Sequence, residues 1–92
     1  MVTRDIIITK QEGIHLIPAT AIAQKALAFP DNTIRLAKDG LKVNAQSVTD
    51  IIRLNAGFQS TVSLSIAGPD EEKCLQDMLT VFKETDLADV ES

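Results

Sequence analysis

The sequence predicts a two-layer α+β protein, in which helices pack on one face of a four-stranded antiparallel sheet. Short segments of alternating apolar and polar residues indicate strands, and longer segments with apolar residues three and four positions apart indicate helices. The two kinds follow one another in the order β-α-β-β-α-β-α, which is typical of this architecture. Because 92 residues can enclose one hydrophobic core but not two, we expect residues 1–92 to form a single domain.

A polar turn separates the first expected strand from the first expected helix. Residues 5–9 are a β-branched run that predicts a strand with Ile6 and Ile8 on one face, and residues 10–13 form the turn. A helical pattern begins near Leu16, with Pro18 in its first turn, where the missing N–H of proline is harmless. Its apolar stripe consists of Ile22, Ala23, Ala26 and Leu27, and residues 30–32 end it.

The middle of the chain predicts a hairpin followed by a short helix. Residues 33–37 and 41–45 both alternate, the second through Leu41, and they flank Asp39-Gly40, a favoured hairpin turn. Ser47 is expected to cap a helix that carries Val48, Ile51, Ile52 and Leu54. Such a cap contributes about 1 kcal/mol. Asp50, three residues after the cap, is expected to be a weak capping-box partner.

The last third of the chain predicts a strand, a helix and a tail. Residues 61–67 alternate cleanly, and Gly68-Pro69 ends the strand. Acidic residues then begin a helix, where they suit the positive end of the helix dipole. The buried stripe expected for this helix consists of Cys74, Leu75, Met78, Leu79 and Phe82. Residues 85–92 are expected to be a frayed acidic tail.

Composition excludes several classes of function. A formal charge of −4, a pI near 4.7 and three aromatic residues argue against nucleic-acid binding, which needs clustered cations or stacking platforms. No apolar stretch is long enough to span a membrane, so we expect no membrane insertion and a cytoplasmic protein. One histidine and one cysteine, Cys74, cannot assemble a metal site of the usual kind, and neither a metal nor another cofactor is expected.

His15, the single histidine, is the residue best placed for chemistry. It precedes a helix whose first N–H groups, roughly those of Leu16 and Ile17, are free to bind an anion. A phosphoryl group on the ring would therefore meet a prepared anion site. The alternative interpretation is a purely structural polar residue at a helix start, which a lone histidine at such a place more often is.

Two segments together resemble the HPr family of phosphocarrier proteins of the bacterial phosphotransferase system. The first is Gly13-Ile14-His15-Leu16-Ile17-Pro18-Ala19, the second runs from Gly40 to Ser47, and the resemblance extends over about residues 3 to 85. It implies the open-faced β-sandwich of that family. It also implies that His15 accepts a phosphoryl group, derived from phosphoenolpyruvate, from enzyme I and passes it to sugar-permease components.

The same resemblance implies roles for other residues. Leu16, Ile17 and Pro18 would form the phosphate cradle around His15, with Pro18 fixing the entry into the helix. An apolar surface for docking partners would consist of Leu16, Ile17, Val48 and Ile52. Ser47 occupies the position that HPr kinase phosphorylates in many Gram-positive members of the family.

Several positions depart from the family pattern. Ile17 stands where the family usually has an arginine that pairs with the phosphate, and Gln46 stands where it has a lysine. Thr49 and Asp50 replace small or apolar docking residues, and Lys42 is displaced from the family's position. A basic rim that would attract the acidic surface of enzyme I is therefore thinned.

These departures leave three interpretations open. The first is a phosphocarrier. The second is a regulatory paralogue that binds an enzyme or a transcription regulator, with phosphorylation of Ser47 as a candidate switch. The third is an unrelated α+β interaction module whose motifs match by chance.

Overall fold

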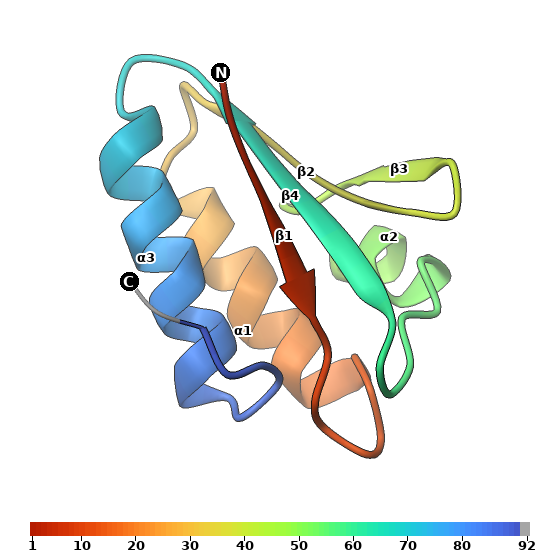
Figure 1. Cartoon of the computed structure of the whole chain (residues 1–92). Coiled ribbons are helices and arrows are strands. Elements are labelled where there is room, and N and C mark those ends of the chain that lie inside the picture. Colours follow the sequence, from red (N-terminus) through yellow and green to blue (C-terminus); the bar gives the residue numbers. More distant parts are fainter. Residues whose placement is uncertain (91–92) are drawn as a thin grey trace.

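The computed structural model describes residues 1–90 and shows one four-stranded sheet with three helices (Figure 1). Along the chain the elements are β1 Val2–Ile7, α1 Leu16–Leu27, β2 Thr33–Lys38, β3 Leu41–Asn44, α2 Val48–Arg53, β4 Thr61–Ala67 and α3 Glu71–Glu84. The strands lie in the order β1-β4-β2-β3, and every neighbouring pair is antiparallel. The predicted order and fold class are confirmed.

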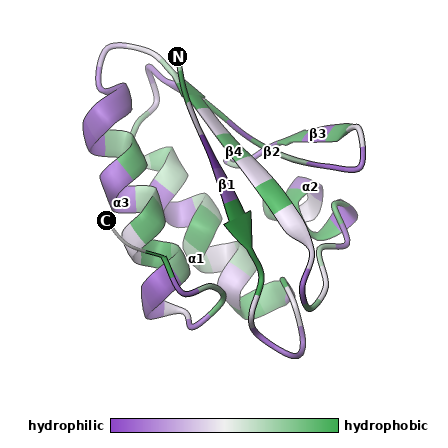
Figure 2. Cartoon of the chain, in the orientation of Figure 1, coloured by the Kyte–Doolittle hydropathy of each residue, from purple (hydrophilic) through white to green (hydrophobic). Residues whose placement is uncertain are grey.

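The strands bury one face and expose the other. In β4, Val62, Leu64 and Ile66 are buried while the residues between them are half-buried, and β4 shows the same alternation in Figure 2. The helices cover the buried face, with α1 and α3 running in opposite directions side by side (Figure 1). The N-terminus of α1 and the C-terminus of α3 consequently lie at the same end of the molecule, which is where His15 is found.

The first strand has the predicted faces but not the predicted bounds. Ile6 and Ile8 are buried and Ile7 is exposed, as the alternation indicates. However, the hydrogen-bonded pairing with β4 begins at Val2, opposite Ile66, and ends at Ile7. The predicted strand, residues 5–9, therefore starts three residues too late and ends two residues too late. These limits depend on the residues of β4 with which β1 pairs, and they cannot be predicted from the sequence of β1 alone.

The predicted stripe of α1 is correct except at its last member. Ile22, Ala23 and Ala26 are buried, but Leu27 is 58% exposed. The helix ends at Leu27, and Phe29 fills the core at this end, because the chain turns back where the Phe29 N–H donates to the Ala26 carbonyl. The predicted stripe of α3 is confirmed in full.

The hairpin turn has the geometry that Asp-Gly predicts. Asp39 and Gly40 have φ angles of 52° and 84°, the left-handed pair that matches the twist of the flanking strands β2 and β3. Of the residues expected to face inward on the second strand, Val43 and Ala45 are buried, whereas Leu41 beside the turn is 38% exposed. Leu41 lies in β3, the edge strand of the sheet, next to the turn.

The expected frayed tail is wrong for its first residues, because they pack against the core. Leu87 is completely buried, Ala88 is nearly so, and the Leu87 N–H donates to the Phe82 carbonyl over 3.0 Å. The Leu87 carbonyl accepts hydrogen bonds from the N–H groups of Thr9 (2.8 Å) and Lys10 (3.2 Å). The segment after α3 is thereby joined to the segment that leads to His15. Residues 91–92 of the expected tail lie outside the described residues.

Candidate functional site

His15 is the N-cap residue of α1. Its backbone is extended (φ −117°, ψ −168°), and its carbonyl accepts the N–H of Ala19 over 2.9 Å, which begins the helical hydrogen-bond pattern. The side chain is half-buried and makes no capping hydrogen bond to the helix end among the described residues. The imidazole therefore takes no part in capping the helix and remains available for other contacts.

The residues just before His15 are held by the loop that precedes β4. Gly13 has a φ of +69°, and a β-carbon there would lie 2.7 Å from the Gly57 Cα and collide with the Ala56 carbonyl oxygen. That same oxygen accepts the N–H of Ile14 over 2.9 Å. Glycine is required at position 13 both for its backbone angle and for this close approach. The contact fixes where His15 enters the helix.

Two of the amide groups that follow His15 are free donors. The N–H groups of Leu16 and Ile17, in the first helical turn, have no backbone acceptor within residues 1–90. Pro18 has no N–H to offer, so the predicted cradle has two donors rather than three. Pro18 is instead buried and fixes the first turn of the helix.

An open pocket of about 510 Å³ lies beside the imidazole. Its lining residues come from three places in the sequence: the turn before α1, the start of α1 and the end of α3. They are Lys10, Glu12, His15, Ile17, Pro18, Glu84 and Thr85. Only His15, Ile17 and Pro18 were expected here. Glu84 and Thr85 are brought in by the packing of α3 against α1, which no local sequence pattern shows.

Apolar side chains are exposed next to the histidine. Leu16 is 62% exposed and Ile17 is 75% exposed, on either side of the first turn of α1. Of the other two residues expected on a docking surface, Ile52 is 41% exposed and Val48 is half-buried. Both lie on α2, which packs against α1.

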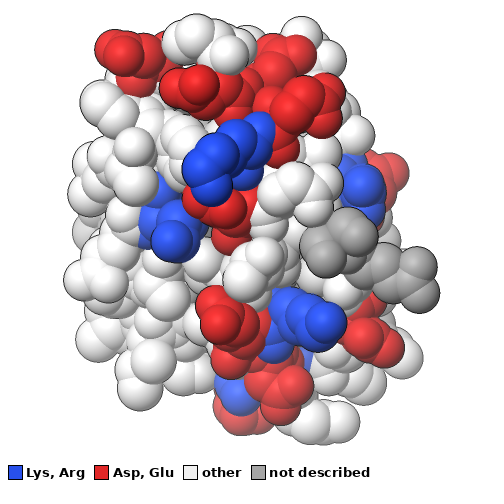
Figure 3. All heavy atoms as spheres, turned by 90° about the vertical axis from the view of Figure 1, so that its left-hand side faces the viewer, with Lys and Arg blue, Asp and Glu red and all other residues white. Residues whose placement is uncertain are grey.

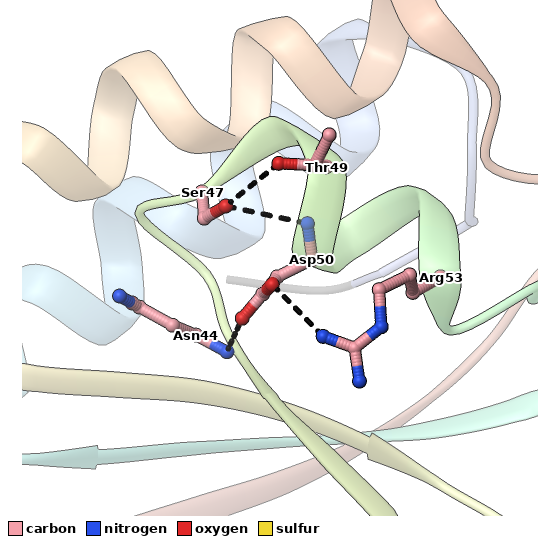
Figure 4. A network of polar contacts seen from close by, with 5 residues as sticks. All are labelled: Asn44, Ser47, Thr49, Asp50 and Arg53. Atoms are coloured by element: carbon pink, nitrogen blue, oxygen red, sulfur yellow. Dashed lines mark hydrogen bonds and ion pairs between the residues drawn. The ribbon is translucent and has the colours of Figure 1, made fainter.

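Ser47 caps α2 as expected. Its hydroxyl accepts the backbone N–H of Asp50 over 3.3 Å and lies 3.3 Å from the Thr49 hydroxyl (Figure 4). The capping-box prediction for Asp50 is wrong, because its carboxylate accepts instead from the Asn44 N–H (3.4 Å) and from Arg53 (3.1 Å). A full capping box would need that carboxylate at the Ser47 N–H, which donates to the Asn44 carbonyl.

Gln46 has a structural use of its own. Its side-chain amide donates to the carbonyl of Ala26 over 3.1 Å and to that of Phe29 over 3.4 Å. These carbonyls lie at the C-terminal end of α1, where backbone acceptors lack helical partners. Gln46 therefore joins the end of α1 to the segment that begins α2.

The face that carries α3 bears charges of both signs. Figure 3 shows acidic side chains gathered towards one end of this face, with basic ones between them, and a second mixed group at the other end. Two ion pairs bring opposite charges together on α3: Lys73 with Asp77 over 3.3 Å, and Glu71 with the N-terminal amine of Met1 over 3.2 Å. This face offers no uniform field that would attract a strongly charged partner.

Cys74 is shielded inside the core. Burial, together with the negative charges of Asp77 and Asp70, raises the pKa of its thiol to about 11. A thiol of this kind stays protonated and is a poor nucleophile. Among residues 1–90, no three histidine, cysteine or acidic side chains come together in a way that would bind a metal ion.

Within the described part of the chain, no helix is both long enough and apolar enough to cross a membrane.

Comparison with known proteins decides the family. Residues 2–84 match the family model described as the PTS HPr component phosphorylation site. The chain belongs to the HPr family. Because the match extends over residues 2–84, the interpretation of an unrelated module with chance motifs is excluded.

Individual HPr-family proteins agree with this assignment. The phosphocarrier protein HPr of Treponema pallidum is 34% identical over 83 residues, covering 90% of this chain and 93% of that protein. The HPr-like protein Crh of Halalkalibacterium halodurans is 30% identical, covering 90% of this chain and 98% of that protein. The solved histidine-containing phosphocarrier protein of Mycoplasma has the same fold, with a TM-score of 0.93 at 20% identity, covering 97% of this chain and all of that one.

Proposed function

We propose that this protein is a phosphocarrier domain that accepts a phosphoryl group on His15. The observation that carries the proposal is the position of His15. It is a half-buried histidine that caps α1 without using its side chain, beside an open pocket and two free backbone N–H groups. Family membership supplies the chemistry, since the matching family model describes a phosphorylation site.

In the proposed transfer step this chain provides the acceptor atom and the groups that stabilise the transferred phosphoryl group. A ring nitrogen of His15 forms a bond to phosphorus while the bond between phosphorus and the donor atom breaks. The electron pair of that bond stays with the donor, which takes up the proton that the His15 ring releases. The N–H groups of Leu16 and Ile17 then stabilise the anionic oxygens of the transferred group. Pro18 keeps the first turn in place, so the donors do not have to be ordered during the reaction.

The proposed partners are enzyme I as donor and a sugar-permease component as acceptor. Leu16, Ile17, Val48 and Ile52 form the proposed docking surface. Because Ile17 and Gln46 are uncharged, we expect docking to depend more on apolar contact than on steering by charge. Weak dependence of the transfer rate on salt between about 0.05 and 0.5 M would agree with this.

Incubation of the whole protein with enzyme I and phosphoenolpyruvate tests the acceptor role. We expect one acid-labile, alkali-stable phosphoryl group per chain, and none in His15→Ala. Retention of the label in His15→Ala, or its absence from the wild type, would overturn the proposal.

A regulatory function is a second candidate, favoured by two specific observations. Ile17 stands where the family's arginine would bind the phosphate, and an HPr-like Crh protein is among the relatives. In this case the protein would act by binding an enzyme or a transcription regulator, with phosphorylation of Ser47 by HPr kinase as the switch. A phosphate on Ser47 would lie at the backbone N–H of Asp50, which the Ser47 hydroxyl already accepts, and it would add negative charge to the helix start that carries the Asp50–Arg53 ion pair.

The variant Ile17→Arg distinguishes the two functions. If the natural protein is a slow carrier, an arginine at this exposed position should raise the rate of phosphorylation by enzyme I at least about tenfold, because a charge-assisted bond to phosphate contributes about 1.5–3 kcal/mol. Ile17→Gln serves as the uncharged control. Rapid and complete transfer from wild-type His15 to a permease domain would argue against the regulatory alternative.

A further inference from the structure

The pocket beside His15 holds one cation and two carboxylates. Of the residues that line it, Lys10 is the only basic one, and Glu12 and Glu84 are acidic. Ile17, which also lines the pocket, brings no charge. A phosphoryl group on His15 would therefore enter a site whose fixed charges are negative on balance, and Lys10 is the only side chain there that attracts it.

The backbone of Lys10 is held by hydrogen bonds, whereas its ammonium group forms no ion pair within residues 1–90. Its N–H donates to the Leu87 carbonyl over 3.2 Å, and its carbonyl accepts the Gly13 N–H over 3.0 Å. These two bonds anchor the residue between the segment after α3 and the turn that leads to His15. The ammonium forms no ion pair with Glu12, Glu84 or any other carboxylate of residues 1–90.

We propose that Lys10 binds the phosphoryl group carried by His15, and so supplies the positive charge that Ile17 does not. The inference rests on the proposed acceptor role of His15. Lys10 reaches the pocket from the turn before α1, whereas the family's arginine lies within α1. The two carboxylates oppose it, so removing either of them should have the opposite effect to removing Lys10.

Chemical phosphorylation of the whole protein by phosphoramidate tests this without any partner protein. In this reaction a ring nitrogen of His15 displaces ammonia from phosphorus, and no other reactant is needed. We expect Lys10→Gln to lower the rate about three- to tenfold and Lys10→Arg to keep it near that of the wild type. Glu12→Gln and Glu84→Gln should each raise the rate. The effect of Lys10→Gln should shrink as salt is raised to about 1 M, where screening extends to about 3 Å.

Lys25→Gln, on the exposed side of α1, is the matched control for loss of one positive charge, and thermal unfolding of each variant checks that the fold is intact. An unchanged rate in folded Lys10→Gln would overturn the inference. A rate in Lys10→Arg as low as that in Lys10→Gln would also overturn it. So would a wild-type protein whose His15 is not phosphorylated by phosphoramidate. A wild type that reacts with phosphoramidate but not with enzyme I would contradict the proposed carrier function, and the comparison of variants would still decide on Lys10.

Discussion

At the scale of single residues, the backbone and the side chain of His15 have separate roles. The backbone of His15 begins α1, whereas its ring remains available to a ligand. Ser47 differs, because its hydroxyl is the helix cap itself. A phosphoryl group on His15 would leave the helix start unchanged, but one on Ser47 would replace the cap by a larger, charged one.

The cap at Ser47 has a measurable consequence for stability. Ser47→Ala removes the acceptor of the Asp50 N–H, and the free energy of unfolding should fall by about 1 kcal/mol. Ser47→Thr keeps a hydroxyl at this position, and its free energy of unfolding should fall by much less. Urea unfolding followed by circular dichroism measures both. Equal stability of Ser47→Ala and the wild type would mean that the cap is not used in solution.

Cys74 predicts how the protein responds to alkali. Because burial raises the thiol pKa from its ordinary value of 9.0 to about 11, the folded state holds this proton more tightly than the unfolded state. The corresponding stability is present below pH 9.0 and is lost as the pH rises towards 11. Iodoacetamide should not label the native protein at pH 8 and should label it in denaturant. Cys74→Ala should remove this part of the pH dependence, and rapid native labelling would contradict the burial.

At the scale of elements, the position of α1 depends on a contact between two loops. Gly13→Ala would drive a β-carbon into the backbone at residues 56–57, and we expect a loss of about 2 kcal/mol or more of unfolding free energy. Phosphorylation should slow as well, because His15 would be displaced. Gly57→Ala is the matched control, since a β-carbon there meets nothing within 4 Å. If both variants unfold at the same denaturant concentration, the contact does not hold the site.

At the scale of the whole molecule, the segment after α3 connects the core to the site. Leu87→Ala should lower the unfolding free energy by about 2–5 kcal/mol, because it empties a fully buried position. It should also disturb the segment of Thr9 and Lys10, whose N–H groups the Leu87 carbonyl accepts. Leu27→Ala, at an exposed leucine, should change stability by about 0.5 kcal/mol or less. Thermal unfolding compares the two, and a tail that frays in solution would leave Leu87→Ala as stable as Leu27→Ala.

Local patterns determined the elements and the position of His15. Alternation indicated the strands, and the 3.6-residue period indicated the helices, because both depend on which side chains face the core. The predicted helix start after His15 placed free amide groups beside the only histidine. The bounds of β1, the exposed Leu27 and the packed Leu87 were not predictable in this way, since each depends on a partner far away in the sequence.

His15 itself marks the boundary between what the sequence and the tertiary structure decided. The sequence by itself determined that a histidine precedes a helix, and that Ile17 offers no charge to a phosphate. Only the tertiary structure decided what surrounds the ring. Packing of α3 against α1 places Glu84 in the pocket, and the Leu87 carbonyl holds the turn that brings Lys10 there. Such contacts join residues about seventy positions apart, and a pattern of local spacing carries no record of them.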